Sequence, residues 1–197
     1  MVSSPSGAGK SAILSRAREA DPTLLFSVSA TTRPPRKGEQ DGREYYFLTR
    51  DEFLRRVEAG EFVEWAEVHG NLYGTLHSEM ERLAHSGHDA VVEIDVQGAA
   101  SLREQALSMV SVFIMPPSLE ELERRLLGRG TETPDVVALR VSNARHELEQ
   151  FRHYDFIVVN DDLETAVADF SAIVRARRCR VERFAGLTDS ETGAAIK

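Results

Sequence analysis

The chain has 197 residues, of which 42% are hydrophobic, and its 24 lysines and arginines against 32 aspartates and glutamates give a formal net charge of -8. That length supports one hydrophobic core with small additions, and the acidic balance does not indicate a nucleic-acid partner, so any anionic ligand must be held by local groups of arginine and lysine. The one cysteine, Cys179, excludes an internal disulfide, and because no apolar run approaches the ~20 residues of a membrane span and the start lacks a secretory pattern, we expect a cytoplasmic protein without a membrane partner.

Strands and helices alternate along the first half of the chain. Thr49 and Glu52 form a capping-box signature, which predicts that a helix begins there. The other elements are predicted from the spacing of apolar residues. In chain order they are a helix over 10–20, a strand running into a loop over 24–33, strands over 45–48 and 62–68, a turn and short strand over 71–75, and a helix near 77–86.

The second half continues the alternation. The run 89–98 (DAVVEIDVQG) has the near-continuous apolar character of a buried parallel strand. Further strands are predicted over 109–117 and 156–160, and helices over 99–105, from Ser118, over 135–154 and from Leu163. Strands alternating with helices predict an α/β fold, a parallel sheet with helices on both faces.

Residues 4–11 (SPSGAGKS) have the spacing of a phosphate-binding loop. In such a loop, glycines let backbone N–H groups converge on phosphate, a lysine reaches the β- and γ-phosphates, and a hydroxyl binds Mg²⁺. Gly7, Gly9, Lys10 and Ser11 match the pattern, whereas Ser4 stands at the position of its first glycine. The alternative is a glycine-rich turn without a ligand.

Only Met1, Val2 and Ser3 precede this loop, which should emerge from a buried strand. A typical strand has about 5–6 residues. We therefore expect a truncated first strand, with the native polypeptide starting upstream of Met1.

Arg33 and Arg36 are separated by two prolines in the segment TTRPPR. A polyproline II segment turns once in three residues, so both side chains leave the same face about 9 Å apart along the axis. Two guanidiniums so placed can clamp a phosphate dianion. The alternative is a solvated, proline-rich loop.

Glu64 shares one face of the strand FVEWAEV with Phe62, Ala66 and Val68. A carboxylate in that company is costly to bury unless it accepts hydrogen bonds. It suits a ligand with adjacent N–H donors, such as the edge of guanine. The alternative is an edge strand on which Glu64 faces water.

Glu93, Asp95 and Gln97 fall on one face near the carboxyl end of the predicted strand 89–98. Open α/β sheets bind ligands at that end. Asp95 is placed like the acid that organises Mg²⁺ in phosphate-loop enzymes.

Arg129 and Arg140 flank a short segment that contains glycine and threonine. A mobile lid that brings arginines onto transferring phosphates has this character. The alternative is that Arg124, Arg125 and Arg140 are ordinary solvated charges on helix faces.

Together these motifs resemble the guanylate kinase family. The resemblance rests on PSGAGKS, FSVSATTRPPRKGEQDGREYYF, NLYGT, EIDVQGA, GRGTET and VVNDD, and runs from about Ser4 to the last helix. It implies phosphoryl transfer from ATP to GMP or dGMP, with Mg²⁺ as cofactor. Ser4, and Ala12 in place of a second hydroxyl, depart from the family pattern.

The resemblance also implies roles for individual residues. The GMP site would comprise Ser29, Arg33, Arg36, Tyr45, Glu64, Tyr73, Thr75, Glu93 and Asp95, of which Glu64, Thr75 and Glu93 would read the guanine. ATP would contact Ser4, Pro5, Ser6, Gly7, Ala8, Gly9, Lys10, Ser11, Asn160 and Asp161. The transferring group would meet Lys10, Arg36, Arg129 and Arg140, and Mg²⁺ would be held by Ser11 and Asp95, largely through water and phosphates.

The family organisation maps onto the chain in three parts and a tail. We expect a phosphate-loop core over 1–27, 86–128 and 141–185, a small mixed α/β GMP-binding insertion over 28–85, a lid over 129–140 and a disordered tail over 186–197. Two alternatives remain open: a non-catalytic module of the same fold that binds phosphopeptides, and a kinase for another nucleoside monophosphate.

Overall fold

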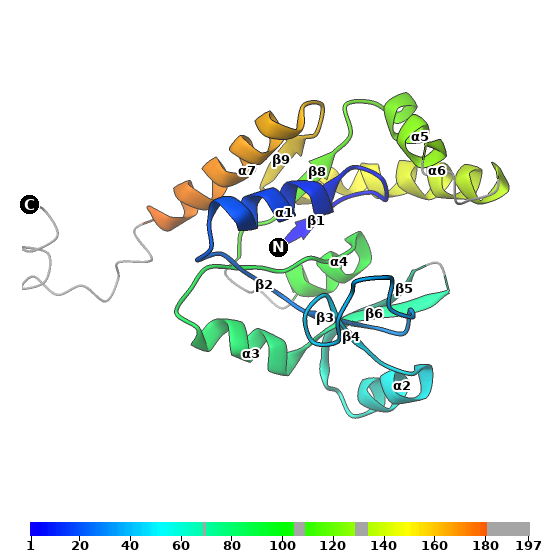
Figure 1. Cartoon of the computed structure of the whole chain (residues 1–197), viewed down its shortest axis with the longest axis vertical. Coiled ribbons are helices and arrows are strands. Elements are labelled where there is room, and N and C mark those ends of the chain that lie inside the picture. Colours follow the sequence, from blue (N-terminus) through cyan, green and yellow to red (C-terminus); the bar gives the residue numbers. More distant parts are fainter. Residues whose placement is uncertain (69, 105–108, 129–133, 181–197) are drawn as a thin grey trace, which may run out of the picture.

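A parallel sheet forms the centre of the core, and a mixed sheet lies beside it (Figure 1). The computed structural model describes residues 1–68, 70–104, 109–128 and 134–180. Two predictions, the lid arginine Arg129 and the tail 186–197, lie outside the described residues.

Within the described residues, the core sheet is assembled from five short strands. They are β1 (Val2–Ser3), β2 (Leu25–Phe26), β7 (Ala90–Val91), β8 (Val112–Met115) and β9 (Phe156–Val159). The order β1-β8-β9 and the pair β2-β7 are both parallel. A parallel bridge between Val2 and Glu93 joins the two groups, with hydrogen bonds from the Val2 amide to the Val92 carbonyl (2.9 Å) and from the Ile94 amide to the Val2 carbonyl (3.1 Å). β1, though only two residues long, is therefore bonded on both sides.

Helices cover both faces of this sheet. α1 (Lys10–Ala20) and α7 (Leu163–Arg178) pack against each other and contribute to a cluster that contains Val2. α3 (His77–His85) and α4 (Val96–Glu104) contribute to a second cluster that contains Met1. Because neighbouring residues of a strand point to opposite faces, Met1 and Val2 enter different clusters. The predicted parallel sheet flanked by helices is confirmed.

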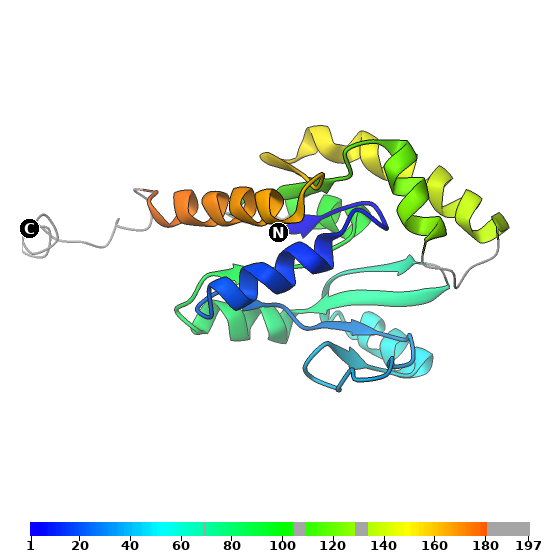
Figure 2. The ribbon, with the colours of Figure 1, turned by 45° about the horizontal axis from the view of Figure 1, so that its top comes forward.

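The second sheet has the order β4-β3-β6-β5, with β3 and β4 parallel and the other pairs antiparallel. Its strands are β3 (Ser29–Thr31), β4 (Tyr45–Phe47), β5 (Phe62–Val68) and β6 (Asn71–Leu76), and α2 (Arg50–Glu58) covers it. Phe53 of α2 stacks on Phe62 of β5 with ring centres 4.3 Å apart. In Figure 2 this sheet and α2, in light blue and cyan, lie below the core.

The helices α5 (Leu119–Leu127) and α6 (Pro134–Glu149) lie at the side of the molecule away from the end of α7 (Figure 2). A short 3₁₀ helix, Gln150–His153, follows α6. The predicted caps are confirmed, since the Thr49 and Ser118 hydroxyls accept hydrogen bonds from the amides three residues on, each at 3.2 Å. None of the described helices is long and apolar enough to cross a membrane.

Three boundary predictions were wrong. The strand expected to run into a loop over 24–33 is instead followed by a second strand, so that β2 and β3 belong to different sheets. The strand expected over 89–98 ends early, because Asp95 accepts hydrogen bonds from the Gln97 and Gly98 amides and so begins α4. Gln97 consequently lies on a helix. The helix expected to reach residue 154 ends at Glu149.

Candidate active site

The phosphate-binding loop connects β1 to the first turn of α1. Gly7 and Gly9 adopt φ angles of 91° and 93°, in the left-handed region that favours glycine. Gly9 is the N-cap of α1, and its carbonyl accepts hydrogen bonds from the Ala12 and Ile13 amides. The loop therefore ends at a helix N-terminus, where unpaired amides and the helix dipole favour an anion.

Asn160, which follows β9, braces this loop. Its side-chain amide donates to the Ala8 carbonyl at 2.7 Å, and its own carbonyl accepts from Arg125 at 3.0 Å. A methyl group built on Gly9 would lie 2.1 Å from the Asn160 amide nitrogen, so this approach also requires glycine. The sequence predicted a contact of Asn160 with adenine, which stays a prediction; the bracing role was not predicted.

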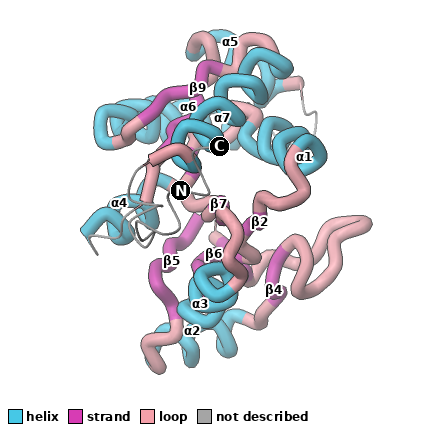
Figure 3. Tube along the Cα trace, turned by 90° about the vertical axis from the view of Figure 1, so that its left-hand side faces the viewer, coloured by secondary structure: helices cyan, strands magenta, loops and turns pink. Residues whose placement is uncertain are grey.

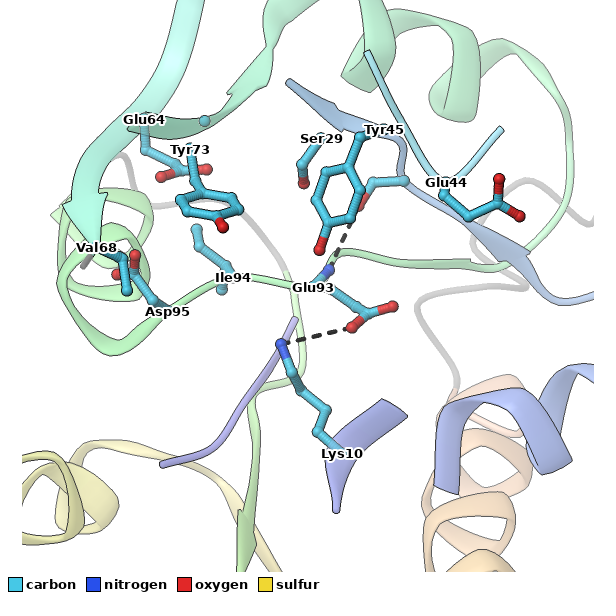
Figure 4. A pocket seen from close by; sticks show the side chains of 12 residues that line it. Lys10, Ser29, Glu44, Tyr45, Glu64, Val68, Tyr73, Glu93, Ile94 and Asp95 are labelled. Carbon is cyan, nitrogen blue, oxygen red and sulfur yellow. Dashed lines mark hydrogen bonds and ion pairs between the residues drawn. The ribbon is translucent and has the colours of Figure 1, made fainter. Parts of the chain in front are cut away.

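Lys10 extends from the loop toward the carboxylate of Glu93. The two charged groups are 3.5 Å apart, and the Glu93 amide donates to the Ser27 hydroxyl at 3.3 Å (Figure 4). Glu93 belongs to the core, where it bridges to Val2, and the hollow beside it is also lined by Tyr45 and Tyr73 of the second sheet. The two predicted sites therefore face each other across one hollow.

This hollow gathers most of the predicted GMP residues. Its lining comprises Lys10, Ser27, Ser29, Glu44, Tyr45, Glu64, Val68, Tyr73, Gly74, Glu93, Ile94 and Asp95 (Figure 4). An adjoining hollow shares Tyr45, Tyr73 and Glu93 and adds Ser11, Arg33, Arg36 and Glu39. Thr75, Asn160 and Asp161 line neither hollow.

Glu64 lies on β5 with only 8% of its surface exposed, which contradicts the alternative of a solvent-facing edge residue. Burial raises the pKa of its carboxyl to about 7, and the negative charge of Asp95 adds to the rise. The nearby Thr75 hydroxyl opposes this rise in the pKa. Within the described residues, that hydroxyl has no hydrogen-bond partner of good geometry. A buried carboxyl beside a buried hydroxyl is suited to a ligand that supplies N–H donors.

Arg33 is held in place from several sides. Its guanidinium donates to the Pro34 carbonyl at 2.7 Å and to Glu39 at 2.9 Å, and lies over the Tyr45 ring, 5.3 Å from its centre. Glu39 also accepts from the Arg36 amide at 2.6 Å, and Arg33 holds the pKa of the Glu39 carboxyl below its usual value. Glu39 therefore fixes the guanidinium of Arg33 and the backbone of Arg36 in the adjoining hollow, which both arginines line.

Sequence reasoning missed three residues around the site. Glu39 holds the clamp; its position three residues after Arg36 in a charged turn was the available signal. Gly98 gives room to Glu64, since a methyl group there would lie 2.3 Å from the Glu64 carboxylate. Glu147 of α6 accepts a hydrogen bond from the Ser6 amide at 3.3 Å, a contact across 141 residues that no local pattern indicates.

The core is a parallel sheet with a phosphate loop at a helix N-terminus, and the loop faces a hollow lined by carboxylates and arginines. These features define a phosphate-loop nucleotide-binding protein. The sequence pattern of the family "Guanylate kinase" matches residues 1–177. The chain is 46% identical to a guanylate kinase of Cereibacter sphaeroides, covering 98% of this chain and 92% of that protein. It is 47% identical to a guanylate kinase of Thermotoga maritima, with coverages of 93% and 88%.

A solved structure agrees with these relatives. The crystal structure of guanylate kinase from Anaplasma phagocytophilum matches with a TM-score of 0.74 and 38% identity, over 91% of this chain and 85% of that one. The chain belongs to the guanylate kinase family and is a kinase, an enzyme that transfers a phosphoryl group.

Proposed function

We propose that the protein transfers the γ-phosphoryl group of ATP to GMP or dGMP, giving ADP and GDP or dGDP. The observation that carries this proposal is the 3.5 Å approach of Lys10, on the phosphate loop, to Glu93, on the wall of the hollow that contains Glu64 and Tyr45. One hollow thus offers a phosphate-binding lysine and a carboxylate able to recognise a base. Binding both substrates side by side supplies most of what phosphoryl transfer requires.

The acceptor nucleotide would be held at both ends. Arg33, Arg36, Tyr45 and Tyr73 would bind its phosphate, since guanidiniums and phenol hydroxyls donate to phosphate oxygens. Ser29 would contribute a further hydroxyl contact.

At the other end, Glu64 would accept the two adjacent N–H groups of guanine, assisted by Thr75 and Glu93. Adenine presents a different pattern, with an acceptor at N1, so it would leave Glu64 unpaired. This contact would select GMP over AMP.

The transfer itself would depend on cations rather than on a protein nucleophile. Lys10 would reach the phosphates of ATP, and Arg36, Arg129 and Arg140 would neutralise charge on the transferring group. Asn160 and Asp161 would contact the adenine. Closure of the segment 129–140 would exclude water, which otherwise competes as acceptor.

Ser11 and Asp95 fit a role in holding Mg²⁺. Ser11 is exposed in the first turn of α1, and a hydroxyl and a carboxylate are the oxygen ligands that Mg²⁺ prefers. The described residues contain no group of three His, Cys, Asp or Glu side chains placed to hold a metal, so nucleotide phosphates and water would supply the remaining ligands. Bound there, Mg²⁺ would neutralise charge on the β- and γ-phosphates.

A coupled assay of ADP release tests this function. The protein is given ATP and Mg²⁺ with GMP, dGMP, AMP, UMP or dTMP, or with no acceptor. We expect release with GMP and dGMP that exceeds the other reactions by at least about tenfold, because a mismatched base leaves buried groups unpaired. Equal release with AMP or dTMP would indicate another nucleoside monophosphate kinase. No release with any acceptor would indicate a binding module.

A further inference from the structure

Glu79, on α3, is a buried carboxylate with no part in the chemistry proposed above. It lies in the first turn of the helix and is only 2% exposed. A charged group so deeply buried is unfavourable unless it is paired and hydrogen-bonded, so its partners indicate what it holds together.

The partners of Glu79 come from three segments. Its carboxylate accepts hydrogen bonds from the Val28 amide at 2.8 Å, from Arg82 at 2.7 and 2.9 Å, and from the Tyr46 hydroxyl at 3.5 Å. Arg82 in turn donates to the Phe26 carbonyl at 3.5 Å. The Glu79–Arg82 pair therefore contacts the backbone on both sides of Ser27.

The backbone from Phe26 to Val28 connects the two sheets. β2 ends at Phe26 and pairs in the core, whereas β3 begins at Ser29 and pairs in the second sheet. Figure 3 shows β2 and β7 above α3, at the junction of the two sheets. Ser27, between the bonded positions, is fixed to the core through its amide to the Val91 carbonyl and accepts from the Glu93 amide. A change of backbone angles here would move the whole second sheet relative to Lys10.

We propose that Glu79 and Arg82 are positioning residues that clasp this junction and so set the distance between the bound GMP and the phosphate loop. The inference rests on the proposed function, because it assigns GMP to the second sheet. Hinges act through a few residues that absorb changes of φ and ψ. Bonds to the Phe26 carbonyl and the Val28 amide restrict those angles.

A second contact extends the clasp toward the substrate. Tyr46, bonded to Glu79, follows Tyr45 on β4, and the Tyr45 ring contacts Arg33 of the phosphate clamp. Displacement of β4 would therefore displace the group that grips the GMP phosphate. Small misplacements of a bound reactant lower transfer rates steeply.

The test compares Glu79→Gln and Arg82→Gln with Glu81→Gln, which removes a charge from an exposed position of the same helix. For each protein, melting temperature, KM for GMP, KM for ATP and kcat are measured. In the two clasp variants we expect KM for GMP to rise and kcat per folded enzyme to fall, each about tenfold, with KM for ATP within twofold of wild type. We expect the double variant to resemble the worse single variant, since both changes break one pair. Glu81→Gln should match wild type.

A purely structural role predicts a different pattern. It would lower the melting temperature and the fraction of active enzyme, and so lower the apparent kcat only in proportion to the enzyme that is not folded, without changing KM for GMP. A KM for GMP within twofold of wild type in folded Arg82→Gln, or equal rises in both KM values, overturns the proposal. If Glu79→Gln does not fold, Tyr46→Phe, which removes only the hydroxyl contact, and Arg82→Gln decide the question.

Failure of the proposed function is recognised separately. A wild-type protein that does not phosphorylate GMP refutes that function, and calorimetric titration with GMP alone then judges the clasp. Under that condition, weaker GMP binding by Arg82→Gln than by Glu81→Gln supports the clasp. Equal binding by the two variants, or no binding by wild type, contradicts it.

Discussion

Glu64 is buried in the second sheet, yet its proposed contact with guanine requires a negative charge. Its pKa of about 7 lies above the ordinary value of 4.5, chiefly because of burial. The folded protein therefore binds this proton more tightly than the unfolded chain does. The contribution of Glu64 to the free energy of unfolding is fully present below pH 4.5 and is lost as the pH rises through 7.

GMP binding should become stronger as the pH rises, whereas the stability contribution of Glu64 becomes smaller. Only ionised Glu64 can accept both N–H groups of guanine, so we expect KM for GMP to fall about tenfold between pH 6 and pH 8. Steady-state kinetics at saturating ATP measure this change. Glu64→Gln is the control, because the phosphate of GMP titrates equally in both proteins. A profile of Glu64→Gln as steep as that of wild type would assign the effect to the substrate.

Replacing Glu64 should also weaken selection at a fixed pH. At pH 8, Glu64→Gln presents an N–H where guanine also presents one, at a cost of about 1–3 kcal/mol, or roughly tenfold to a hundredfold in kcat/KM for GMP. Glu67→Gln, on the exposed face of the same strand, is the matched control. A kcat/KM of Glu64→Gln equal to that of Glu67→Gln would remove Glu64 from the base site.

The arginines should divide between binding and transfer. We expect Arg36→Ala mainly to raise KM for GMP, because that side chain would hold a phosphate charged in the ground state. Arg129→Ala should mainly lower kcat, because a lid arginine would act on charge as the group transfers; each change should reach about tenfold or more. Initial-rate kinetics in which both substrates are varied separate the effect on KM for GMP from the effect on kcat. Similar effects of both variants on KM and kcat would contradict the assignment.

At the scale of elements, α4 begins directly beside Glu64. Asp95 caps the helix by accepting from the Gln97 and Gly98 amides, and Gly98 leaves the space that the Glu64 carboxylate uses. The helix start and the base site are therefore one structural unit. A glycine inside a helix normally lowers stability, and here its small size has a function.

Gly98→Ala tests this relation. The new methyl group would lie 2.3 Å from the Glu64 carboxylate oxygen and 2.8 Å from Ile94, so we expect Glu64 to move and KM for GMP to rise about tenfold. Alanine also favours the helix by roughly 1 kcal/mol, which opposes any loss of melting temperature. Ser101→Ala, on the exposed side of α4, is the control. A KM for GMP equal to that of the control would show that Glu64 does not need this space.

At the scale of the whole molecule, contacts between distant segments fix the phosphate loop. Asn160 reaches Ala8 across 152 residues, and Glu147 reaches Ser6 across 141. Together they connect β9 and α6 to the loop. The loop conformation therefore depends on the completed core, in addition to its own glycines.

Asn160→Ala should loosen the loop by leaving the Ala8 carbonyl without this partner. We expect affinity for ATP to fall by about 1–3 kcal/mol, and affinity for tripolyphosphate, which has no base, to fall as much. Calorimetric titration with both ligands measures this. Asp161→Ala, at the exposed neighbouring position, should leave tripolyphosphate binding unchanged. If Asn160→Ala weakens ATP alone, its main contact is with adenine.

Local sequence patterns predicted much of the fold. Residues within a few positions of one another indicated the helix over 10–20, the caps at Thr49 and Ser118, and the apolar strand face that Glu64 shares. The confirmed family membership was indicated by long motifs, in particular the segment from FSVSATTR to YYF. These features are predictable because hydrogen bonds along a helix, caps and strand alternation involve near neighbours.

Only the tertiary structure decided how the two sheets meet. Contacts between distant segments decide three features: the division of 24–33 into β2 and β3, the hydrogen bond of Glu79 to Val28, and the hydrogen bond of Asn160 to Ala8. Buried polar groups must find partners wherever the folded chain brings them, and those partners leave no periodic signal in the sequence. By itself the sequence determined the chemistry available to this protein, and the packing of the folded chain decided the arrangement of those groups around one hollow.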